Sequence, residues 1–425
     1  MHRLIRFPVA AVAAAAALSA CSAGGNGGGP SAVSQTSAPA GSDSPSPSAG
    51  ASDSASPSAS PTPAAPVARL AYATPTAVFV VGLGANGQPT SPPQPVSDTI
   101  AAGPGAGMSD LQWSRNGRYL SWSQLAPGVE GIAYGLYDSS TGKHVVISGP
   151  SNGAAVATTT DMGLLMMTDT RVTPYDGTGR PGAARTVRFQ GQVVNLDTPD
   201  DGQLLASVAG AEPGGLLLTV GTGATAHLVE VNGAGTAIDL GSLADPQDAP
   251  LVNGAAGRDG YIAAEQGDHT DGCGVPPASV VLVVAPGTPA TQIALPASPA
   301  GAIERAINLT VSTDHVVGAT LVACGNGQGA GYPTDFAELH GTGWQVVAND
   351  ALAASRGPGG LLAYVHARIG GEGEKYGPRG DQHLKIVTKG GTQGADLGGP
   401  VTAVLFAPGS APAPASASPS TSASP

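Results

Sequence analysis

Two short segments in the second half of the chain hold residues whose chemistry suits metal binding. The first contains Asp268, His269, Asp271 and Cys273, and the second contains Cys324, so carboxylate, imidazole and thiol groups are all present. Zinc uses these ligand types, but structural zinc sites usually contain close ligand pairs such as C-x-x-C or H-x-x-x-H. Neither spacing occurs around the two cysteines, so we expect no metal site here.

A third segment carries an unusual density of charge. Only 11% of the residues in the chain are charged, yet one short stretch contains Glu372, Glu374, Lys375, Tyr376, Arg379 and Asp381. Such a segment is suited to contacting a partner, and a solvated, mobile loop is the alternative. Together with Asp268, His269 and Asp271 it forms our candidate binding surface.

Residues 82–87 form a G-x-G-x-x-G pattern after an apolar run, which is where a dinucleotide fingerprint would lie. That chemistry requires a helix directly afterwards, because the free N–H groups at a helix N-terminus hold the pyrophosphate. Four prolines in residues 89–95 exclude such a helix, since proline lacks the amide donor and clashes with the preceding turn. We therefore interpret residues 78–81 as a strand, and Asn86 with Gly87 as the tight turn to an outer strand.

Common catalytic motifs are absent from the sequence. There is no G-x-S-x-G elbow, no H-E-x-x-H, no P-loop and no set of penicillin-recognising motifs. Six of the eight histidines fall in or beside expected strands, with no assignable serine or cysteine partner: His144, His227, His315, His340, His366 and His383. We therefore expect a protein without catalytic residues and without a cofactor.

The N-terminus has the features of an export signal. Arg3 and Arg6 precede the apolar run 7–18, which is too short to span a bilayer core of about 30 Å. The run ends in L-S-A-C, which resembles a bacterial lipobox, with Cys21 as the lipidated residue. An ordinary cleaved signal peptide is the alternative. We predict an exported protein anchored to the outer face of the cell membrane by lipid on Cys21.

This location bears on the other two cysteines. Exported proteins fold in compartments that are oxidising enough for disulfides to form and persist. With Cys21 used by lipid, Cys273 and Cys324 are the remaining cysteines. We predict that they form a disulfide between neighbouring loops, with a metal site as the weaker alternative.

Composition divides the chain into four parts. Residues 1–20 are the expected signal, residues 21–66 a disordered Ser/Ala/Pro linker after the lipidated cysteine, residues 67–407 the folded domain and residues 408–425 a disordered tail. Losing the two arginines of the signal changes the formal net charge from −12 to −14. This acidity excludes a basic surface for nucleic acid and leaves no electrostatic attraction to anionic lipid.

A repeated unit fills the folded part. The clearest copy, DLQWSRNGRYLSWSQ at residues 110–124, places an Arg-Asn-Gly turn between two alternating strands, and Asn-Gly is a strong hairpin signal. Weaker copies in the same phase are residues 158–167, 211–220, 255–264, 311–320 and 355–364. Two more strands follow each pair, which gives four strands in roughly 40 to 50 residues, as in a propeller blade.

The unit resembles the W-S-P-D-G strand pair of TolB-like and other WD40-like β-propellers, with Arg115 and Asn116 where proline and aspartate are usual. This resemblance, to the propeller domains of actinobacterial exported lipoproteins, implies an all-β ring of four-stranded blades. Residues 68–97 would supply three strands of one blade, and residues 400–408 its missing first strand, so the C-terminal strand would close the ring. Six intact units and this composite blade predict seven blades. Six blades, typical of TolB-like propellers, are one alternative, and a β-sandwich or two β domains another.

The ring would gather the candidate residues on one face. Residues 267–278, 323–335 and 368–381 would connect the second and third strands of consecutive blades, where long loops suggest function. We expect a monomeric scaffold that binds an envelope protein or a small ligand. The alternatives are a propeller lyase or hydrolase acting on cell-wall glycan or peptide, and a sensor of envelope state.

Overall fold

The strongest predicted hairpin shows how the local sequence builds the fold. Strands β4 (Gly107–Trp113) and β5 (Tyr119–Leu125) pair in antiparallel fashion. In the turn between them, the Asn116 side-chain oxygen accepts a hydrogen bond from the Arg118 N–H at 2.9 Å. Gly117 has φ 66°, a left-handed conformation that glycine adopts without a side-chain clash. The Asn-Gly signal in the sequence therefore does form the expected turn.

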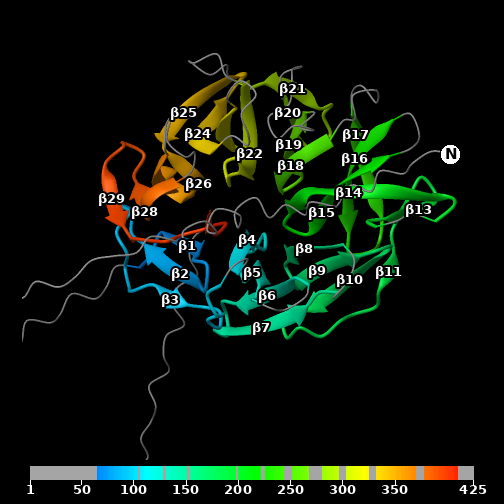
Figure 1. Cartoon of the computed structure of the whole chain (residues 1–425), viewed down its shortest axis with the longest axis horizontal. Coiled ribbons are helices and arrows are strands. Elements are labelled where there is room, and N and C mark those ends of the chain that lie inside the picture. Colours follow the sequence, from blue (N-terminus) through cyan, green and yellow to red (C-terminus); the bar gives the residue numbers. More distant parts are fainter. Residues whose placement is uncertain are drawn as a thin grey trace, which may run out of the picture.

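This hairpin recurs around the molecule. The computed structural model describes residues 65–103, 106–127, 131–150, 154–197, 200–221, 225–243, 251–267, 280–295, 303–324, 332–369 and 378–409 (Figure 1). Apart from a 3-10 turn at Pro358–Gly360, the regular secondary structure of these residues consists of β-strands. The fold class of this part of the chain is all-β, as predicted.

Five of the sheets contain four strands each. They are formed by β4, β5, β6 (Ala133–Asp138) and β7 (Lys143–Ser148); by β8 (Ala155–Thr160), β9 (Gly163–Thr168), β10 (Arg171–Asp176) and β11 (Arg185–Thr186); by β22 (Ile303–Val311), β23 (Val317–Cys324), β24 (Tyr332–His340) and β25 (Gly343–Asn349); by β26 (Ala351–Arg356), β27 (Leu362–Ile369), β28 (Pro378–Val387) and β29 (Gln393–Asp396); and by β30 (Ala403–Phe406), β1 (Ala68–Ala73), β2 (Val78–Leu83) and β3 (Gln94–Pro95). Each sheet is one propeller blade, with its strands named here from the ring axis outward.

The sixth sheet joins two further units. Its strands are β12 (Arg188–Phe189), β13 (Gln192–Asn195), β14 (Gln203–Glu212), β15 (Gly215–Gly221), β16 (Ala226–Asn232), β17 (Ala237–Leu243), β18 (Leu251–Arg258), β19 (Tyr261–Gly267), β20 (Val280–Val284) and β21 (Thr291–Ala294). The inner strands β14 and β18 pair in parallel, at Gly210–Ala255 and Ala211–Ala256, and so link two antiparallel four-stranded units. The described strands thus form seven such units, and the number of blades in the whole ring stays a prediction.

The composite blade closes the ring as the sequence predicts. Its strand order is β3-β2-β1-β30, so three strands from the start of the domain receive their inner strand from its end. β30 pairs antiparallel with β1 from Ala73–Ala403 to Leu70–Phe406. Figure 1 shows the red C-terminal strand beside the blue first strands. The closure leaves β1 without an open edge.

The hydrophobic core lies mainly between neighbouring blades. Trp113 of β4 and Trp122 of β5 are almost fully buried, in a cluster that also contains residues of β1 and β2. Gly135 on β6 makes room for Trp122, since a side chain at this glycine would overlap the indole ring. Both tryptophans are therefore core residues that fill the space between blades.

The structure also corrects some expected strand boundaries. Residues 171–201, where the sequence pattern is weakest, form β10 and three short strands, β11, β12 and β13. β13 pairs with β14 outside the four-stranded unit, and β12 pairs with β13. Strands β23, β24, β27 and β28 extend into segments that we expected to be loops. The antiparallel ladders continue through these segments, as the Arg368–Arg379 pair of β27 and β28 shows.

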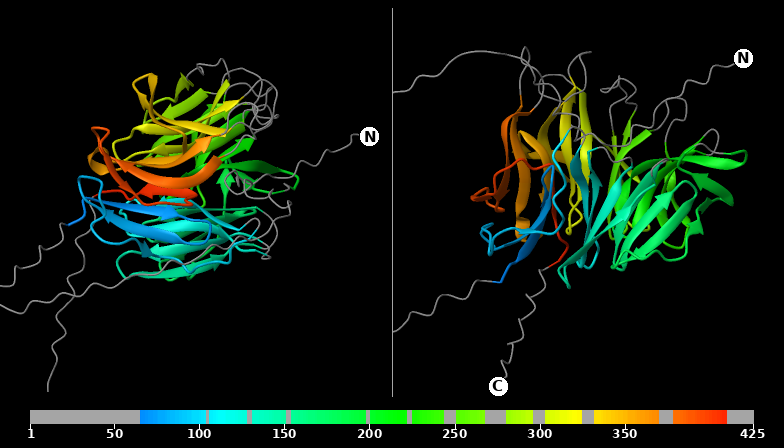
Figure 2. Two further views of the ribbon diagram at one scale, coloured as in Figure 1. Left: turned by 60° about the vertical axis from the view of Figure 1, so that its left-hand side comes forward. Right: turned by 60° about the horizontal axis from the view of Figure 1, so that its bottom comes forward.

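The strand order defines two faces of the ring. On the turn face, the first strand of each blade other than the composite one connects to its second, as at Asp259 and Gly260. On the opposite loop face, the second strand leads toward the third. β1 begins and β30 ends on the turn face, and the right-hand view of Figure 2 shows both ends, blue and red, on the lower side. The start of β1 and the end of β30 therefore both lie on the turn face.

Candidate functional site

Most of the predicted binding surface lies outside the described residues. The predicted site residues outside the described ranges are Cys21, Asp268, His269, Asp271, Cys273, Glu372, Glu374, Lys375 and Tyr376. Cys324 is the last residue of β23. Arg379 and Asp381 belong to β28 and not to a loop, which corrects the predicted extent of the third segment. Lipidation, the disulfide and the binding surface stay predictions.

The strands that flank the three candidate segments are described. β19 and β20, β23 and β24, and β27 and β28 are the second and third strands of three consecutive blades. Their connecting ends therefore lie on the loop face, on the side of the ring opposite to the start of β1 and the end of β30. The predicted place of these segments in the blades is correct.

A cluster of charged side chains lies on the turn face. Arg115 Nη2 donates to Glu212 Oε1 at 2.9 Å, and Arg115 Nε lies 3.8 Å from Asp259 Oδ1. Arg258 Nε lies 3.6 Å from the other oxygen of Asp259. The Glu230 carboxyl is near enough to Glu212 to raise the pKa of Glu212. These five residues are called the Glu212 cluster below.

The inner strands of four blades position this cluster. Glu212 ends β14 and Arg258 ends β18, while Arg115 belongs to the turn after β4. The Thr158 hydroxyl of β8 lies 2.6 Å from the Glu212 backbone oxygen and 2.7 Å from Gln112 Oε1 of β4. β4, β8 and β14 belong to three different hydrogen-bonded sheets, so the cluster connects blades that share no strand pairing.

The environment of Glu212 changes its acidity. Its side chain has no exposed surface, whereas the side chain of Arg115 is 43% exposed. Burial and the neighbouring Glu230 carboxyl raise the pKa of Glu212 to about 7, although Arg115 and the Gly260 N–H act in the opposite direction. A carboxyl that titrates near neutrality is uncommon and marks a candidate functional group.

Two glycines leave the space that the carboxyls occupy. A Cβ atom at Gly257 of β18 would lie 2.6 Å from Glu212 Cβ and 2.9 Å from Glu212 Oε2. A Cβ atom at Gly215 of β15 would lie 2.6 Å from Glu230 Oε1. Neither glycine has a φ that requires glycine, so the close approach of the carboxyls explains both residues.

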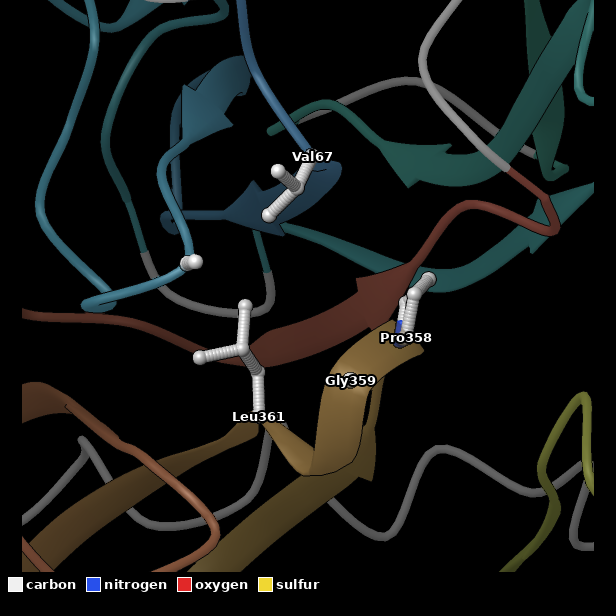
Figure 3. Close-up of a pocket in the computed structure, with 5 residues that line it drawn as sticks. Val67, Pro358, Gly359 and Leu361 are labelled. Carbon is white, nitrogen blue, oxygen red and sulfur yellow. The ribbon is translucent and has the colours of Figure 1, made fainter.

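A small pocket on the turn face is a weaker candidate. It has a volume of about 240 Å³ and is lined by Val67, Ala85, Pro358, Gly359 and Leu361. Figure 3 shows Val67, just before β1, across from the turn between β26 and β27. These residues have no polar side chain that would orient a ligand, so the pocket lacks the convergent polar groups of a specific site.

The histidines and acidic residues of the described ranges are spread over the blades. Among the described residues, no three His, Cys, Asp or Glu side chains come together to hold a metal ion. Three of the described histidines each lie beside one aspartate: His144 Nε2 is 3.2 Å from Asp98 Oδ2, His227 Nδ1 is 3.1 Å from Asp239 Oδ2, and His383 Nδ1 is 3.2 Å from Asp396 Oδ1. No helix within the described ranges is long and apolar enough to cross a membrane.

Comparisons with known proteins found partial matches among solved structures. No protein-family model matches the chain, and no curated protein matches it. Solved structures with a similar fold include TolB from Acinetobacter baumannii, at 13% identity and a TM-score of 0.42, covering 80% of this chain and 67% of that one. The β-propeller domain of the Trilobed protease from Pyrococcus furiosus has 10% identity and a TM-score of 0.41, with coverage of 66% and 80%.

An enzyme is also among these structures. Oligogalacturonate lyase from Vibrio parahaemolyticus has 9% identity and a TM-score of 0.42, covering 70% of this chain and 82% of that one. At such identities the similarity concerns the fold alone, and fold does not determine function. The conclusion that this is a β-propeller closed by its C-terminal strand rests on the strand order described above.

Sequence reasoning did not find the Glu212 cluster. Glu212 and Arg258 lie inside two of the weaker repeat copies, residues 211–220 and 255–264, which predicted only strands and turns. The sequence did contain one signal. Glu212 and Arg258 are each the last residue of the first strand of their unit, a position that the neutral Thr160 occupies in the blade of β8. A charge at that repeat position was a cue to a special contact.

Proposed function

We propose that this protein is a lipid-anchored scaffold that binds an envelope protein or a small ligand outside the cell membrane. The observation that carries the proposal is the topology of the ring. The start of β1 and the end of β30 lie on the turn face, whereas the strand ends leading to the three candidate segments lie on the loop face. A tether at the N-terminal end would leave the loop face free for a partner.

The charge of the candidate segments favours binding over catalysis. Residues 372–376 read E-G-E-K-Y and combine both signs of charge with one aromatic ring, which suits a polar partner surface. The paired carboxyls of the Glu212 cluster offer acid–base chemistry, but Glu212 has no exposed surface to meet a substrate. We therefore place a binding scaffold ahead of a propeller lyase or hydrolase.

The proposal is tested by crosslinking in intact cells. Residues 372–376 are replaced by Gly and Ser residues at the same length, which keeps β27 and β28 intact. We expect partner capture to fall at least tenfold, because the side chains of the contact surface are lost. The matched control ends the chain at Gly409, which removes only the tail on the turn face, and should capture as before.

Two outcomes would count against the proposal. Equal capture by the replaced and original chains would exclude residues 372–376 as the contact surface. Anchoring is measured in the same cells with Cys21→Ser, which should move the chain from the membrane to the soluble fraction. A Cys21→Ser chain that stays with the membrane would contradict the lipid anchor and leave the binding result to be judged separately.

A further inference from the structure

The paired carboxyls at the centre of the Glu212 cluster have no role in the binding proposed above. They lie at the contact between two sheet units, where β14 and β18 pair directly. Glu212 is fully buried at the end of β14. Glu230, which is half-buried, comes from β16, the third strand of the same blade. Glu212 Oε2 is buried and has no hydrogen-bond partner within the described part of the chain.

The charges that face Glu212 do not balance when both carboxyls are ionised. Arg115 is the cation in contact with it, and Arg115 is shared with Asp259, which Arg258 also approaches. β8 contributes the neutral Thr158, and β15 has no titratable residue. Two adjacent carboxylates in a dry site repel each other, and one proton held between them removes that repulsion.

We propose that Glu212 and Glu230 are a proton-dependent latch between blades. With one proton bound, the Glu212 carboxyl donates its O–H to the Glu230 carboxylate, and the β18–β19 turn packs against β14. Release of this proton to solvent leaves two carboxylates facing each other and weakens the contact. Gly257 and Gly215 leave the space in which the two carboxyls meet.

The acidity of Glu212 gives the direction of the effect. Its pKa in the folded chain is about 7, above its ordinary value of 4.5. The folded state therefore binds the proton more tightly than the unfolded state. The stability from this proton is fully present below about pH 4.5 and is lost as the pH rises through 7.

The test measures chemical unfolding of the full chain at pH 5 and pH 8. We expect the unfolding constant to rise roughly 50-fold more between these pH values in the natural chain than in Glu212→Gln, whose amide is neutral at both. The six histidines of the described strands and turns are the same in both chains, so their titration cancels in this comparison. The matched control is Glu338→Gln.

Glu338 is a suitable control because it is also buried but is paired differently. It accepts hydrogen bonds from Arg356 Nε and Nη2 at 2.6 and 2.7 Å, with no second glutamate in that pair. His340 Nε2 also lies 3.7 Å from Glu338 Oε2, but its side chain is half-exposed, so solvent screens this contact. Glu338→Gln should therefore lose stability at both pH values and change the pH dependence far less than Glu212→Gln does. The proposal is overturned if Glu212→Gln keeps the natural pH dependence, or if Glu338→Gln removes it equally.

A second measurement covers the case in which Glu212→Gln does not fold. The infrared spectrum of the natural folded chain should show a protonated buried carboxyl at pH 6 that disappears by pH 8.5. In Glu230→Gln this band should shift in frequency, because the acceptor becomes an amide. An unchanged band in Glu230→Gln, or no such band in the natural chain, would also overturn the latch.

Discussion

The contact that closes the ring and the contact at the Glu212 cluster both join neighbouring blades, but with different chemistry. At the seam, β30 lies among β1, β4 and β26 and buries apolar side chains such as Val404 and Phe406. At the Glu212 cluster, two carboxyls and an arginine meet between β14 and β18. One ring therefore combines an apolar contact with a charged one, and in our proposal the charged contact is the one that depends on pH.

The polar contacts of the seam support its apolar packing. Arg69 Nη2 donates to the Gly117 backbone oxygen at 2.6 Å, and its guanidinium lies 5.0 Å from the centre of the Trp113 ring. Burial lowers the pKa of Arg69, but an arginine keeps its charge at any physiological pH. Burying one large apolar side chain stabilises by about 1.5–3 kcal/mol, whereas a buried charge pair contributes about zero.

The largest effect is expected when the seam is removed. A chain ending at Gly399 lacks β30, loses the burial of Val401, Val404 and Phe406, and exposes the edge of β1. We expect a loss of at least about 5 kcal/mol, comparable with the whole stability of a domain, and therefore no cooperative unfolding transition. Circular dichroism during urea titration measures this.

The control for the seam is the chain ending at Gly409, which keeps β30 and should unfold like the natural chain. If the chain ending at Gly399 unfolds with the same midpoint and slope as this control, the ring does not depend on its composite blade. The apolar seam would then not be the strong contact that distinguishes it from the Glu212 cluster.

A smaller effect is expected from filling the space beside Glu212. Gly257→Ala places a methyl group 2.6 Å from Glu212 Cβ and should cost about 1–3 kcal/mol, because backbone or side chain must move. Gly254→Ala, in the same strand, adds its methyl where no atom lies within 4 Å and is the matched control. Equal unfolding midpoints for the two variants would show that the cluster tolerates displacement.

The smallest effect concerns a second arginine of the same turn. Arg118 donates to both oxygens of Asp138, at 3.0 and 2.8 Å, and these bonds hold the pKa of Asp138 below its usual value. The folded pKa is depressed, so this stability is present above about pH 4 and is lost as the pH falls. Arg118→Gln should cost about 1 kcal/mol or less at pH 7.

This prediction sharpens the comparison, because Arg115 and Arg118 lie in one turn but pair with carboxyls whose acidity shifts in opposite directions. The cost of Arg118→Gln should be constant between pH 5 and pH 8 and disappear in acid. If the stability cost of Arg118→Gln changed between pH 5 and pH 8, the near-neutral pH dependence would not be specific to the Glu212 cluster, and the comparison would be contradicted.

Much of the fold could be predicted from the sequence because its contacts are local. Each blade is a run of hairpins, and Asn116 and Gly117 determine their turn by hydrogen bonding and backbone conformation within a few residues. The composite blade could also be predicted, since residues 68–97 lack one strand and residues 400–408 supply one. The β12–β13 pair was missed because its strands are two and four residues long and attach outside the repeat.

The candidate loop residues were found by composition, but the Glu212 cluster could not be found in that way. Asp259 looks like turn chemistry, and Arg115 like a variant of the repeat. Glu212, the partner of Arg115, lies 97 residues from it, with another blade between them. Arg115 Nη2 and Glu212 Oε1 are 2.9 Å apart because the ring curves and brings their blades together near its axis. No local sequence pattern encodes that curvature.

The sequence by itself determined the four-stranded unit, the closure by the last strand and the acidic, low-charge character of the chain. These follow from alternation, turn residues and composition, each of which acts over a few residues. Only the tertiary structure decided which charges meet and which glycines matter, because blades far apart in the chain converge near the ring axis. Burial there turns Glu212 from an ordinary acid into a group that titrates near neutrality.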